Sequence, residues 1–259
     1  MSRRFVMPKR TIDIHNHLQP GDDGTKLVRL MDEANVERSV ILGTPWWPNE
    51  HVLAAVRKFS DRLVGGVYAD PREKKKAADC IRRYHAEGFR IVKLFPNLGY
   101  YPDDEAVRPF FEKVAELGMA VLSHCGYLTT KETEVASYYS HPGRFEKLVR
   151  TFRDTIFILA HMGGIAGFLE AVLLSDRMPN LYVDCTPGQG LWVLNRAGAM
   201  GRGIPPEKLV WGADSYNLAD LLRVYRAALV KQTYGPHLGK IFHDNAQGIL
   251  EKIGAIPGK

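Results

Sequence analysis

Cysteine is scarce in this chain and offers no framework for a disulfide or a thiolate metal site. The three cysteines, Cys80, Cys125 and Cys185, lie far apart, and none forms a C-x-x-C pair. An odd number of separated thiols argues against a small disulfide-stabilised secreted domain and against zinc bound by sulfur. We therefore expect a protein of the reducing cytoplasm.

Long hydrophobic runs are also missing. No apolar stretch approaches the roughly 20 residues that a helix needs to cross a bilayer. The basic start of the chain contains only Phe5-Val6-Met7 as an apolar run, which is too short for the hydrophobic region of a signal peptide. We expect neither a membrane anchor nor a secretory signal.

The excess of positive charge is small. The 259 residues carry a formal charge of +6, the sequence pI is near 9.2, and the basic residues are scattered along the chain. A balance of this size bears on solubility and nonspecific association. Nucleic-acid binding is therefore not expected, whereas an anionic small-molecule substrate is compatible with this small positive charge. The 45% hydrophobic and 25% charged content is typical of a globular protein with a substantial core.

Eight short apolar runs alternate with amphipathic helical patterns. Predicted strands cover residues 11–17, 38–44, 63–68, 89–95, 119–124, 155–161, 181–185 and 208–213. Predicted helices cover residues 26–34, 49–59, 73–87, 104–117, 143–152, 191–199, 218–231 and 245–253, and one more follows Gly163-Gly164. This alternation predicts an α/β fold, a (β/α)8 TIM barrel. No shift in composition marks a linker, so we expect a single domain over residues 1–259.

The first predicted strand, residues 11–17, ends in two histidines separated by one residue. Strict alternation along a strand places Asp13, His15 and His17 on one face. Two imidazoles on one side of a strand end can chelate one cation. Asp13 lies one layer deeper, and we expect it to support the site or to pack in the barrel.

Polar residues also end four later strands. They are Lys93, His124, His161 and Asp214, on the fourth, fifth, sixth and eighth strands. Because active sites of such barrels are built at the carboxyl ends of the strands, we expect these side chains to meet the two histidines. A set of imidazoles with one carboxylate suits Zn²⁺ first, with Mn²⁺ or Fe²⁺ as alternatives.

The residues around these positions resemble a known family. The segments DIHNH, LSHCG, LAHMGG, WGADS and HDNAQGIL are similar to the amidohydrolase superfamily, in the branch that contains aminocarboxymuconate-semialdehyde decarboxylase and related metal-dependent hydrolases. The resemblance runs from Thr11 to about Leu250. It implies a mechanism in which a hydroxide bound to one metal attacks a carbonyl.

The resemblance also implies a role for each residue of the site. His15, His17, His124 and Asp214 would hold the metal, and Asp214 would also take the proton of the metal-bound water. A zinc-bound water can have a pKa of roughly 7, so a neighbouring carboxylate can accept its proton. His161 would orient the water or polarise the substrate, with a role as second metal ligand as its alternative.

Two further residues have open roles. Lys93 would bridge a second metal as a carboxylated lysine, bind a substrate carboxylate, or pair with a buried acid. Trp46, on the loop after the second predicted strand, would contact substrate over the barrel mouth or pack against a neighbouring loop or subunit.

The resulting prediction is a metal-dependent hydrolase of a small, anionic amide, ester or lactone. The alternative is a nonoxidative decarboxylase of an aromatic or unsaturated acid, which would use the same ligands. Metal-dependent deoxyribonucleases share the barrel and the H-x-H start, but they usually carry a carboxylate on the fourth strand, where this chain has Lys93. A homodimer is the default expectation for such a barrel.

Overall fold

The computed structural model describes residues 10–127, 136–197 and 203–258, and a barrel of eight parallel strands forms its centre. Each strand pairs with the next one in the chain. The strands are β1 Thr11–Asn16, β2 Val36–Leu42, β3 Leu63–Tyr68, β4 Ile91–Leu94, β5 Ala120–Ser123, β6 Phe157–Leu159, β7 Leu181–Asp184 and β8 Leu209–Val210. The predicted (β/α)8 architecture is confirmed.

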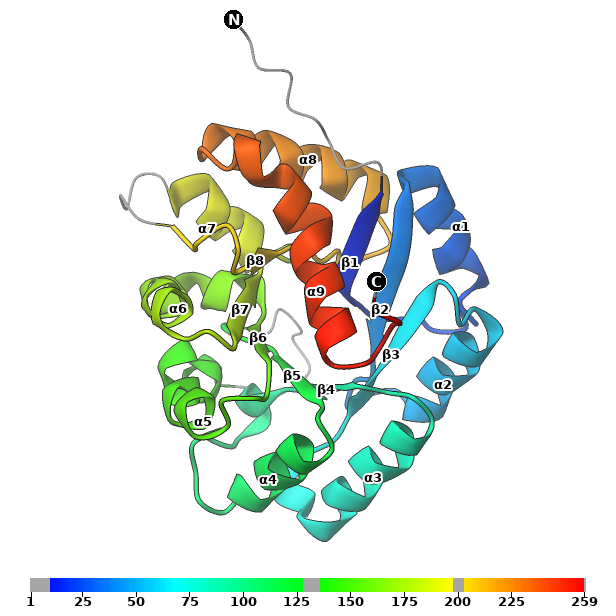
Figure 1. The fold of residues 1–259 in the computed structure, drawn as a ribbon, viewed down its shortest axis with the longest axis vertical. Coiled ribbons are helices and arrows are strands. Elements are labelled where there is room, and N and C mark those ends of the chain that lie inside the picture. The colour runs from blue at the N-terminus through cyan, green and yellow to red at the C-terminus, as the bar shows by residue number, and fades with distance from the viewer. Residues whose placement is uncertain (1–9, 128–135, 198–202, 259) are drawn as a thin grey trace, which may run out of the picture.

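The helices surround the strands, as Figure 1 shows. They are α1 Thr25–Ala34, α2 Asn49–Lys58, α3 Lys75–Ala86, α4 Arg108–Glu116, α5 Glu146–Thr151, α6 Gly164–Arg177, α7 Gln189–Ala197, α8 Leu218–Lys231 and α9 Asn245–Lys252. Among the described residues, none of these helices is long and apolar enough to cross a membrane. Residues 198 and 199 of one predicted helix and residues 128–135 of the predicted loop lie outside the described ranges.

Two predicted helices are shorter than expected. The pattern over residues 104–117 gives a helix only from Arg108, and that over residues 143–152 gives one only from Glu146. Pro109 lies in the first turn of α4, where its missing N–H costs nothing. A 3₁₀ helix that begins at Pro142 precedes α5. The prolines therefore start helical turns here.

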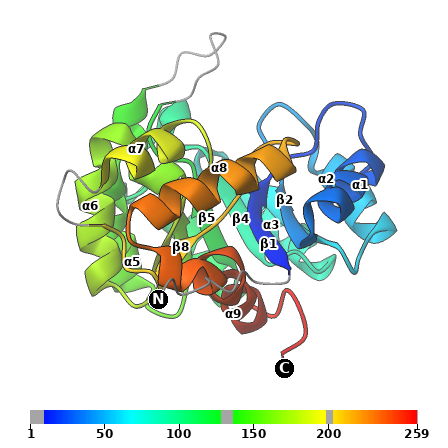
Figure 2. The same cartoon turned by 90° about the horizontal axis from the view of Figure 1, so that it is seen from above.

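The apolar side chains form an inner and an outer layer. The inner cluster fills the barrel and includes Ile12 and Ile158, whereas the outer cluster lies between the strands and the helices. Ala246 and Ile249 of α9 belong to the inner cluster, so α9 closes the end of the barrel at which the strands begin. Figures 1 and 2 show α9 across this end. The opposite rim, where the strands end, is left for the functional site.

The register of β1 against β2 contains an extra residue. Asp13 pairs with Ser39 and Asn16 pairs with Ile41, so three steps along β1 oppose two steps along β2. An extra residue of this kind is a β-bulge, and it reverses the face on which the following side chains lie. The strict alternation predicted for residues 11–17 therefore does not hold.

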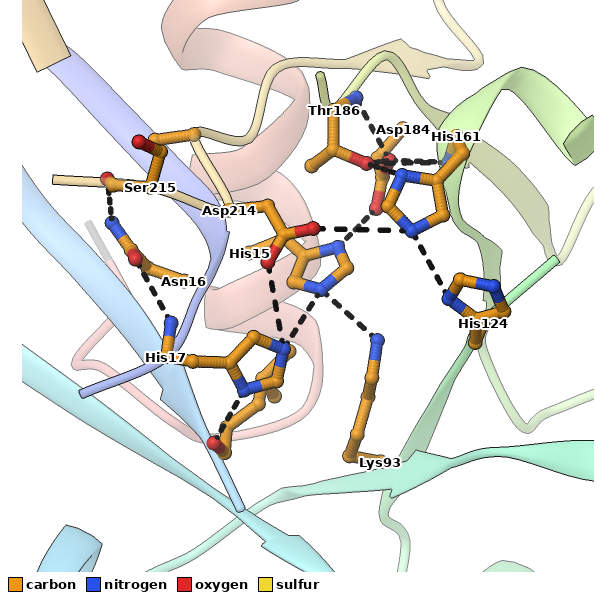
Figure 3. A network of polar contacts seen from close by, with 12 residues as sticks. His15, Asn16, His17, Lys93, His124, His161, Asp184, Thr186, Asp214 and Ser215 are labelled. Carbon is orange, nitrogen blue, oxygen red and sulfur yellow. Dashed lines mark hydrogen bonds and ion pairs between the residues drawn. The ribbon is translucent and has the colours of Figure 1, made fainter. Parts of the chain in front are cut away.

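The bulge separates Asp13 from the two histidines. The Asn16 amide donates a hydrogen bond of 2.8 Å to Asp13 Oδ2, so these side chains share one side of the strand although they are three residues apart. His15 and His17 lie on the other side, at the rim of the barrel (Figure 3). The prediction that Asp13 faces the same way as the histidines is wrong.

The Asp13 carboxylate instead joins three segments of the barrel. It is completely buried, and burial raises its pKa to about 7. It accepts hydrogen bonds at 2.8–3.1 Å from Ala213 N, Asn16 Nδ2, Ser39 Oγ and His15 N. These four donors hold β1, β2 and the segment after β8 in the register that the site requires.

We expect Asp13→Asn to lower the free energy of unfolding by about 2–3 kcal/mol, because an amide N–H₂ would face two donors and leave them unpaired in the core. Urea unfolding at pH 8, where the wild-type carboxyl is ionised, measures this change. The exposed Asp61, substituted in the same way, is the matched control. A difference below about 0.5 kcal/mol between the two variants would contradict the role of Asp13.

The barrel closes through a segment that continues from β8. The prediction of a strand over residues 208–213 was too long, since regular pairing with β7 ends at Val210. The chain then approaches β1, and Asp214 N donates a hydrogen bond of 2.7 Å to His15 O. A side chain at Gly212 would place its Cβ 2.7 Å from His15 Cβ. Glycine is thus required here for close contact between the two ends of the sheet.

Candidate metal centre

The carboxyl ends of five strands deliver polar side chains to one cavity of about 270 Å³. β1 supplies His15, and His17 follows its last residue. Lys93 lies in β4, Trp46 lies in the loop after β2, and the other predicted residues come from the segments after β5, β6 and β8 (Figure 3). The cavity is lined by His15, His17, Thr44, Trp46, Lys93, Phe95, His124, Tyr127, His161, Pro187, Gly188, Gln189 and Asp214. Every site residue predicted from the sequence therefore lies at this cavity.

Three of these residues place ligand atoms close enough to share one ion. His15 Nε2 and His17 Nε2 are 3.3 Å apart, and His17 Nε2 is 3.7 Å from Asp214 Oδ1. Ligand atoms of His15, His17 and Asp214 all lie within 4.8 Å of one another. The described part of the chain thus contains a His/His/Asp group that is able to hold a metal ion.

The Nδ1 atoms of His15 and His17 each lie within hydrogen-bond distance of an acceptor oxygen. His15 Nδ1 lies 2.8 Å from Asp184 Oδ2, and His17 Nδ1 lies 2.8 Å from Leu42 O. A neutral imidazole carries one N–H, which these contacts assign to Nδ1 in both rings. The two Nε2 atoms that face each other therefore both carry lone pairs. Two lone pairs and a carboxylate at these distances require positive charge among them, which a metal ion would supply and to which the Lys93 ammonium, 3.0 Å from His15 Nε2, also contributes.

His124 and His161 form the other half of the centre. His161 Nε2 lies 3.2 Å from His124 Nδ1 and 4.0 Å from Asp214 Oδ2. His124 Nε2 is also 3.3 Å from Tyr127 O, and the single N–H of a neutral ring can serve only one of its two contacts. His124 is not in the close group of three, because the His161 ring lies between it and Asp214. Its role as a metal ligand stays a prediction.

Left-handed backbone turns the two side chains after β6 and β8 into the cavity. His161 has a φ of 57° and Asp214 a φ of 45°, values that L-residues rarely adopt. Residues in such conformations cost of order 1–3 kcal/mol each and cluster at functional sites. The strain at these two positions is independent support for a functional centre here.

Burial keeps the four histidines, His15, His17, His124 and His161, neutral; they are called the histidine cluster below. Burial lowers the pKa of His17 and that of His161 to about 4, and it lowers the pKa values of the other two well below 6.5. The unprotonated form is the one that binds metals. Burial also raises the pKa of Asp214 from its usual value of 3.8, which makes its carboxylate a better proton acceptor.

Lys93 is the cation of this cavity and is almost completely buried. Its Nζ lies 3.0 Å from His15 Nε2 and 4.9 Å from the centre of the Phe95 ring. Burial lowers the pKa of Lys93 to about 8. Carbamate formation needs a neutral amine and substrate binding needs a charged one, and a pKa near 8 supplies both forms at neutral to mildly alkaline pH. Asp214 and Asp184 both act to raise the pKa of Lys93, so the third predicted role, pairing with a buried acid, is also compatible with its position.

The aromatic residues divide between the cavity and the surface. Trp46 lines the cavity and packs edge-on against Phe95, with ring centres 5.4 Å apart, although 45% of it is exposed. Trp47 lines a neighbouring groove instead. Tyr138 and Tyr139, in the loop after β5, pack against each other rather than into the cavity. Trp46 is therefore the exposed tryptophan placed to meet a substrate.

Asp184 and Gln189 were missed in the sequence. Asp184 ends β7 and contacts His15, so the rule that identified the other strand ends also applied to it. Gln189 Nε2 donates a hydrogen bond of 2.7 Å to Tyr127 O, and Tyr127 N donates one of 3.1 Å to Gln189 Oε1. This pair of bonds fixes the carbonyl that contacts His124. No local signal in the sequence points to Gln189.

We expect the metal-free protein to lose stability as the pH falls from about 6.5 to 4. The unfolded histidines take up protons near pH 6.5, whereas the buried cluster stays neutral until about pH 4, so acid favours the unfolded chain. Each such shift corresponds to about 3 kcal/mol. Asp13 and Asp214 act in the opposite direction, because their raised pKa values favour the folded state in acid.

Four histidines lose stability in acid and two carboxyl groups gain it, so we expect the free energy of unfolding to fall between pH 7 and pH 4.5. Urea unfolding at pH 7, 5.5 and 4.5, after removal of metals with a chelator, measures this free energy of unfolding. His161→Asn removes one of the titrating rings, so its free energy of unfolding should change less with pH than that of the wild type. A free energy of unfolding that is constant over this range would contradict the buried, neutral state of the cluster.

Solved structures of three other proteins share this fold. An uncharacterized TIM-barrel protein from Bordetella bronchiseptica is 18% identical over 95% of this chain and 99% of that chain, with a TM-score of 0.72. A 2,6-dihydroxybenzoate decarboxylase, in complex with 2,6-dihydroxybenzoate, is 16% identical over 94% and 100%, with a TM-score of 0.69. A probable 2-pyrone-4,6-dicarboxylic acid hydrolase from Acinetobacter baumannii, with citric acid bound, is 16% identical over 95% and 99%, with a TM-score of 0.66.

Family membership rests on a sequence match. Identities below 20% to the solved structures support the shared fold alone, and no curated protein sequence matches the chain. A family model described as amidohydrolase matches residues 12–250, which run from within β1 to within α9 and include all the residues of the histidine cluster. The resemblance seen in the sequence is confirmed, and the chain belongs to the amidohydrolase family.

Proposed function

We propose that this protein is a metal-dependent hydrolase that acts on a small, anionic amide, ester or lactone. One observation carries the proposal. The Nε2 lone pairs of His15 and His17 and the carboxylate of Asp214 converge within 4.8 Å, and hydrogen bonds on the far sides of both rings hold the lone pairs in place. Such a set of electron-rich atoms is stable around a divalent cation.

Zn²⁺ fits this donor set best, with Mn²⁺ and Fe²⁺ as alternatives, because imidazole nitrogen with one carboxylate oxygen suits all three. We propose His124 as the fourth ligand, because it lines the same cavity and its neutral ring keeps one nitrogen with a lone pair. A second ion bridged by carboxylated Lys93 is compatible with the distance of 3.0 Å from its Nζ to His15 Nε2.

The bound ion would supply positive charge that polarises a carbonyl and lowers the pKa of water to about 7. The chain's own groups do the rest. Asp214 accepts the proton of the attacking water, because its pKa is raised by burial and its oxygens face both halves of the histidine cluster. His161 orients the reacting group. Asp214 would pass its proton to His161 Nε2, which lies 4.0 Å from Asp214 Oδ2, and His161 would give that proton to the leaving group as its bond to the carbonyl carbon breaks.

The cavity itself points to the class of substrate. A volume of about 270 Å³ suits a small molecule rather than a polymer, so we do not propose a nucleic acid. Lys93 provides a buried cation for a carboxylate, and Trp46 with Phe95 provides an apolar wall. These features support a compact anionic substrate with a flat apolar part.

Nonoxidative decarboxylation is the second candidate. The same aromatic wall favours it, since Trp46 and Phe95 line the cavity together with Lys93, so apolar rings and a buried cation adjoin one another there. A flat aromatic acid would fit against Phe95 and Trp46 with its carboxylate toward Lys93. His161 Nε2, once protonated by solvent, would give that proton to the ring carbon as the bond to the carboxyl carbon breaks and carbon dioxide leaves.

Metal analysis and isotope labelling together test the proposal. The purified protein is expected to contain about one zinc per chain, to lose turnover on chelation and to regain it with zinc. For a turned-over acid, hydrolysis in H₂¹⁸O places one ¹⁸O in the product, whereas decarboxylation in D₂O places one deuterium at the former carboxyl carbon. Activity that survives complete metal removal would contradict both candidates.

A further inference from the structure

Asp184, at the carboxyl end of β7, contacts two histidines that have different proposed roles. The side chain is completely buried, and its Oδ2 lies 2.8 Å from His15 Nδ1. Its Oδ1 accepts hydrogen bonds from His161 N at 2.9 Å, from Thr186 N at 3.0 Å and from Thr186 Oγ1 at 2.5 Å. All four contacts place a donor against this carboxylate (Figure 3).

The Thr186 hydroxyl extends this arrangement to the His161 ring. Thr186 Oγ1 lies 2.7 Å from His161 Nδ1. A hydroxyl has a single proton, and this one is donated to Asp184 Oδ1, so the oxygen can only accept from the ring. His161 must therefore carry its proton on Nδ1 and present a lone pair at Nε2, toward His124 and Asp214.

We propose that Asp184 is a positioning residue that fixes the tautomers of two histidines with one carboxylate. It acts directly on His15, and it acts through Thr186 on His161. Both rings are thereby held with Nδ1 protonated and with Nε2 free to face the cavity. The roles given to the two histidines, metal ligand and acid–base group, rest on the proposed function, whereas the tautomers do not.

The geometry explains why one carboxylate serves both rings. β7 lies next to β6 on one side and next to β8 on the other, and β8 leads into the segment that hydrogen-bonds to β1. Asp184 can therefore reach toward His15 with one oxygen and toward the segment after β6 with the other. A carboxylate has two oxygens that only accept when it is ionised, which suits two N–H groups on opposite sides.

The substitution Asp184→Asn should reverse the tautomer of His15 alone. Three donors face the Oδ1 position, so the amide oxygen stays there and the N–H₂ group is turned toward His15 Nδ1. His15 then has to accept at Nδ1 and carry its proton on Nε2, which removes the lone pair from the cavity. Thr186 can still donate to the amide oxygen, so His161 keeps its tautomer.

The substitution Thr186→Val should have the complementary effect. The methyl group has no oxygen to accept the His161 N–H, so His161 is expected to populate both tautomers, whereas His15 keeps its contact with Asp184. Thr186→Ser restores the hydroxyl and should restore the single tautomer of His161. This rescue separates the hydrogen bond from general packing at the position.

Nitrogen NMR of the full chain, labelled with ¹⁵N-histidine and stripped of metal, measures the tautomers directly at pH 7.5. Assignment comes from single His→Gln variants. The wild type should show Nδ1–H at His15 and at His161, with the changes described above in each variant. An Nε2–H tautomer at His15 in the wild type, or no change there in Asp184→Asn, would overturn the inference.

Zinc affinity, measured by competition with a chelator, separates this inference from the proposed function. Loss of an outer hydrogen-bond partner typically costs 10–100-fold in metal affinity, so Asp184→Asn should bind zinc about 10–100-fold more weakly. Thr186→Val should stay within about threefold of the wild type. If the wild type does not bind zinc but the tautomers shift as described, the proposed function fails while the role of Asp184 stands.

Discussion

His17→Ala is expected to remove the bound metal and to lower turnover by at least about 10³-fold, equivalent to about 4 kcal/mol of transition-state stabilisation. The side chain is only partly buried, at 21% exposure, so its removal should leave the barrel folded. The His17 Nε2 atom lies 3.3 Å from His15 Nε2 and 3.7 Å from Asp214 Oδ1, so the substitution removes one of the three atoms of the His/His/Asp group. Elemental analysis after gel filtration, with steady-state kinetics, measures both effects.

The matched control is His85→Ala. His85 lies in α3, on the outer surface of the barrel and away from the cavity. This variant should retain zinc and turnover within about twofold of the wild type, as is usual for surface substitutions. A His17→Ala protein that keeps its full zinc content would show that the two β1 histidines do not share an ion. The proposed centre would then have no basis.

Asp214→Asn is expected to retain most of the metal while turnover falls by about 10²–10⁴-fold, the range typical of a lost general base. The amide keeps an oxygen near His17 Nε2 but cannot accept a proton. Burial raises the pKa of the wild-type carboxyl, so the group removed is one already suited to proton transfer. Zinc content and the pH dependence of turnover, which should lose its acidic limb, measure the change.

Asp220→Asn, on the exposed first turn of α8, is the matched control for Asp214→Asn and should leave turnover and zinc unchanged. If Asp214→Asn loses zinc and turnover together, Asp214 is chiefly a ligand. Unchanged turnover with full zinc content would mean that another group accepts the proton, and the proposed mechanism would have to be abandoned.

The barrel could be predicted from the sequence because its signals are local. Each strand is a short apolar run, each is followed by an amphipathic helix, and glycines such as Gly88 and Gly118 end several helices with positive φ. The convergence of His15, His124, His161 and Asp214 followed from the fold itself, since parallel strands in a barrel all end at one rim. Periodicity and topology sufficed for this part of the site.

Predictions from local periodicity were wrong where contact with another segment changed the course of a strand. The bulge in β1 depends on how three residues of β1 fit against two of β2, and no property of residues 11–17 alone requires it. The short β8 likewise depends on the close approach of Gly212 to His15. The first contact joins residues 26 apart, such as Asp13 and Ser39, and the second joins residues 197 apart, so a single-strand pattern contains no information about either.

The sequence by itself determined the fold class and the residue types at the rim, because both follow from periods of 2 and 3.6 residues. Only the tertiary structure decided which nitrogen of each histidine faces the cavity, and that Asp184 serves two rings at once. The physical reason is that a tautomer depends on a partner's position to within a few tenths of an ångström. That position is set by packing between strands far apart in the chain.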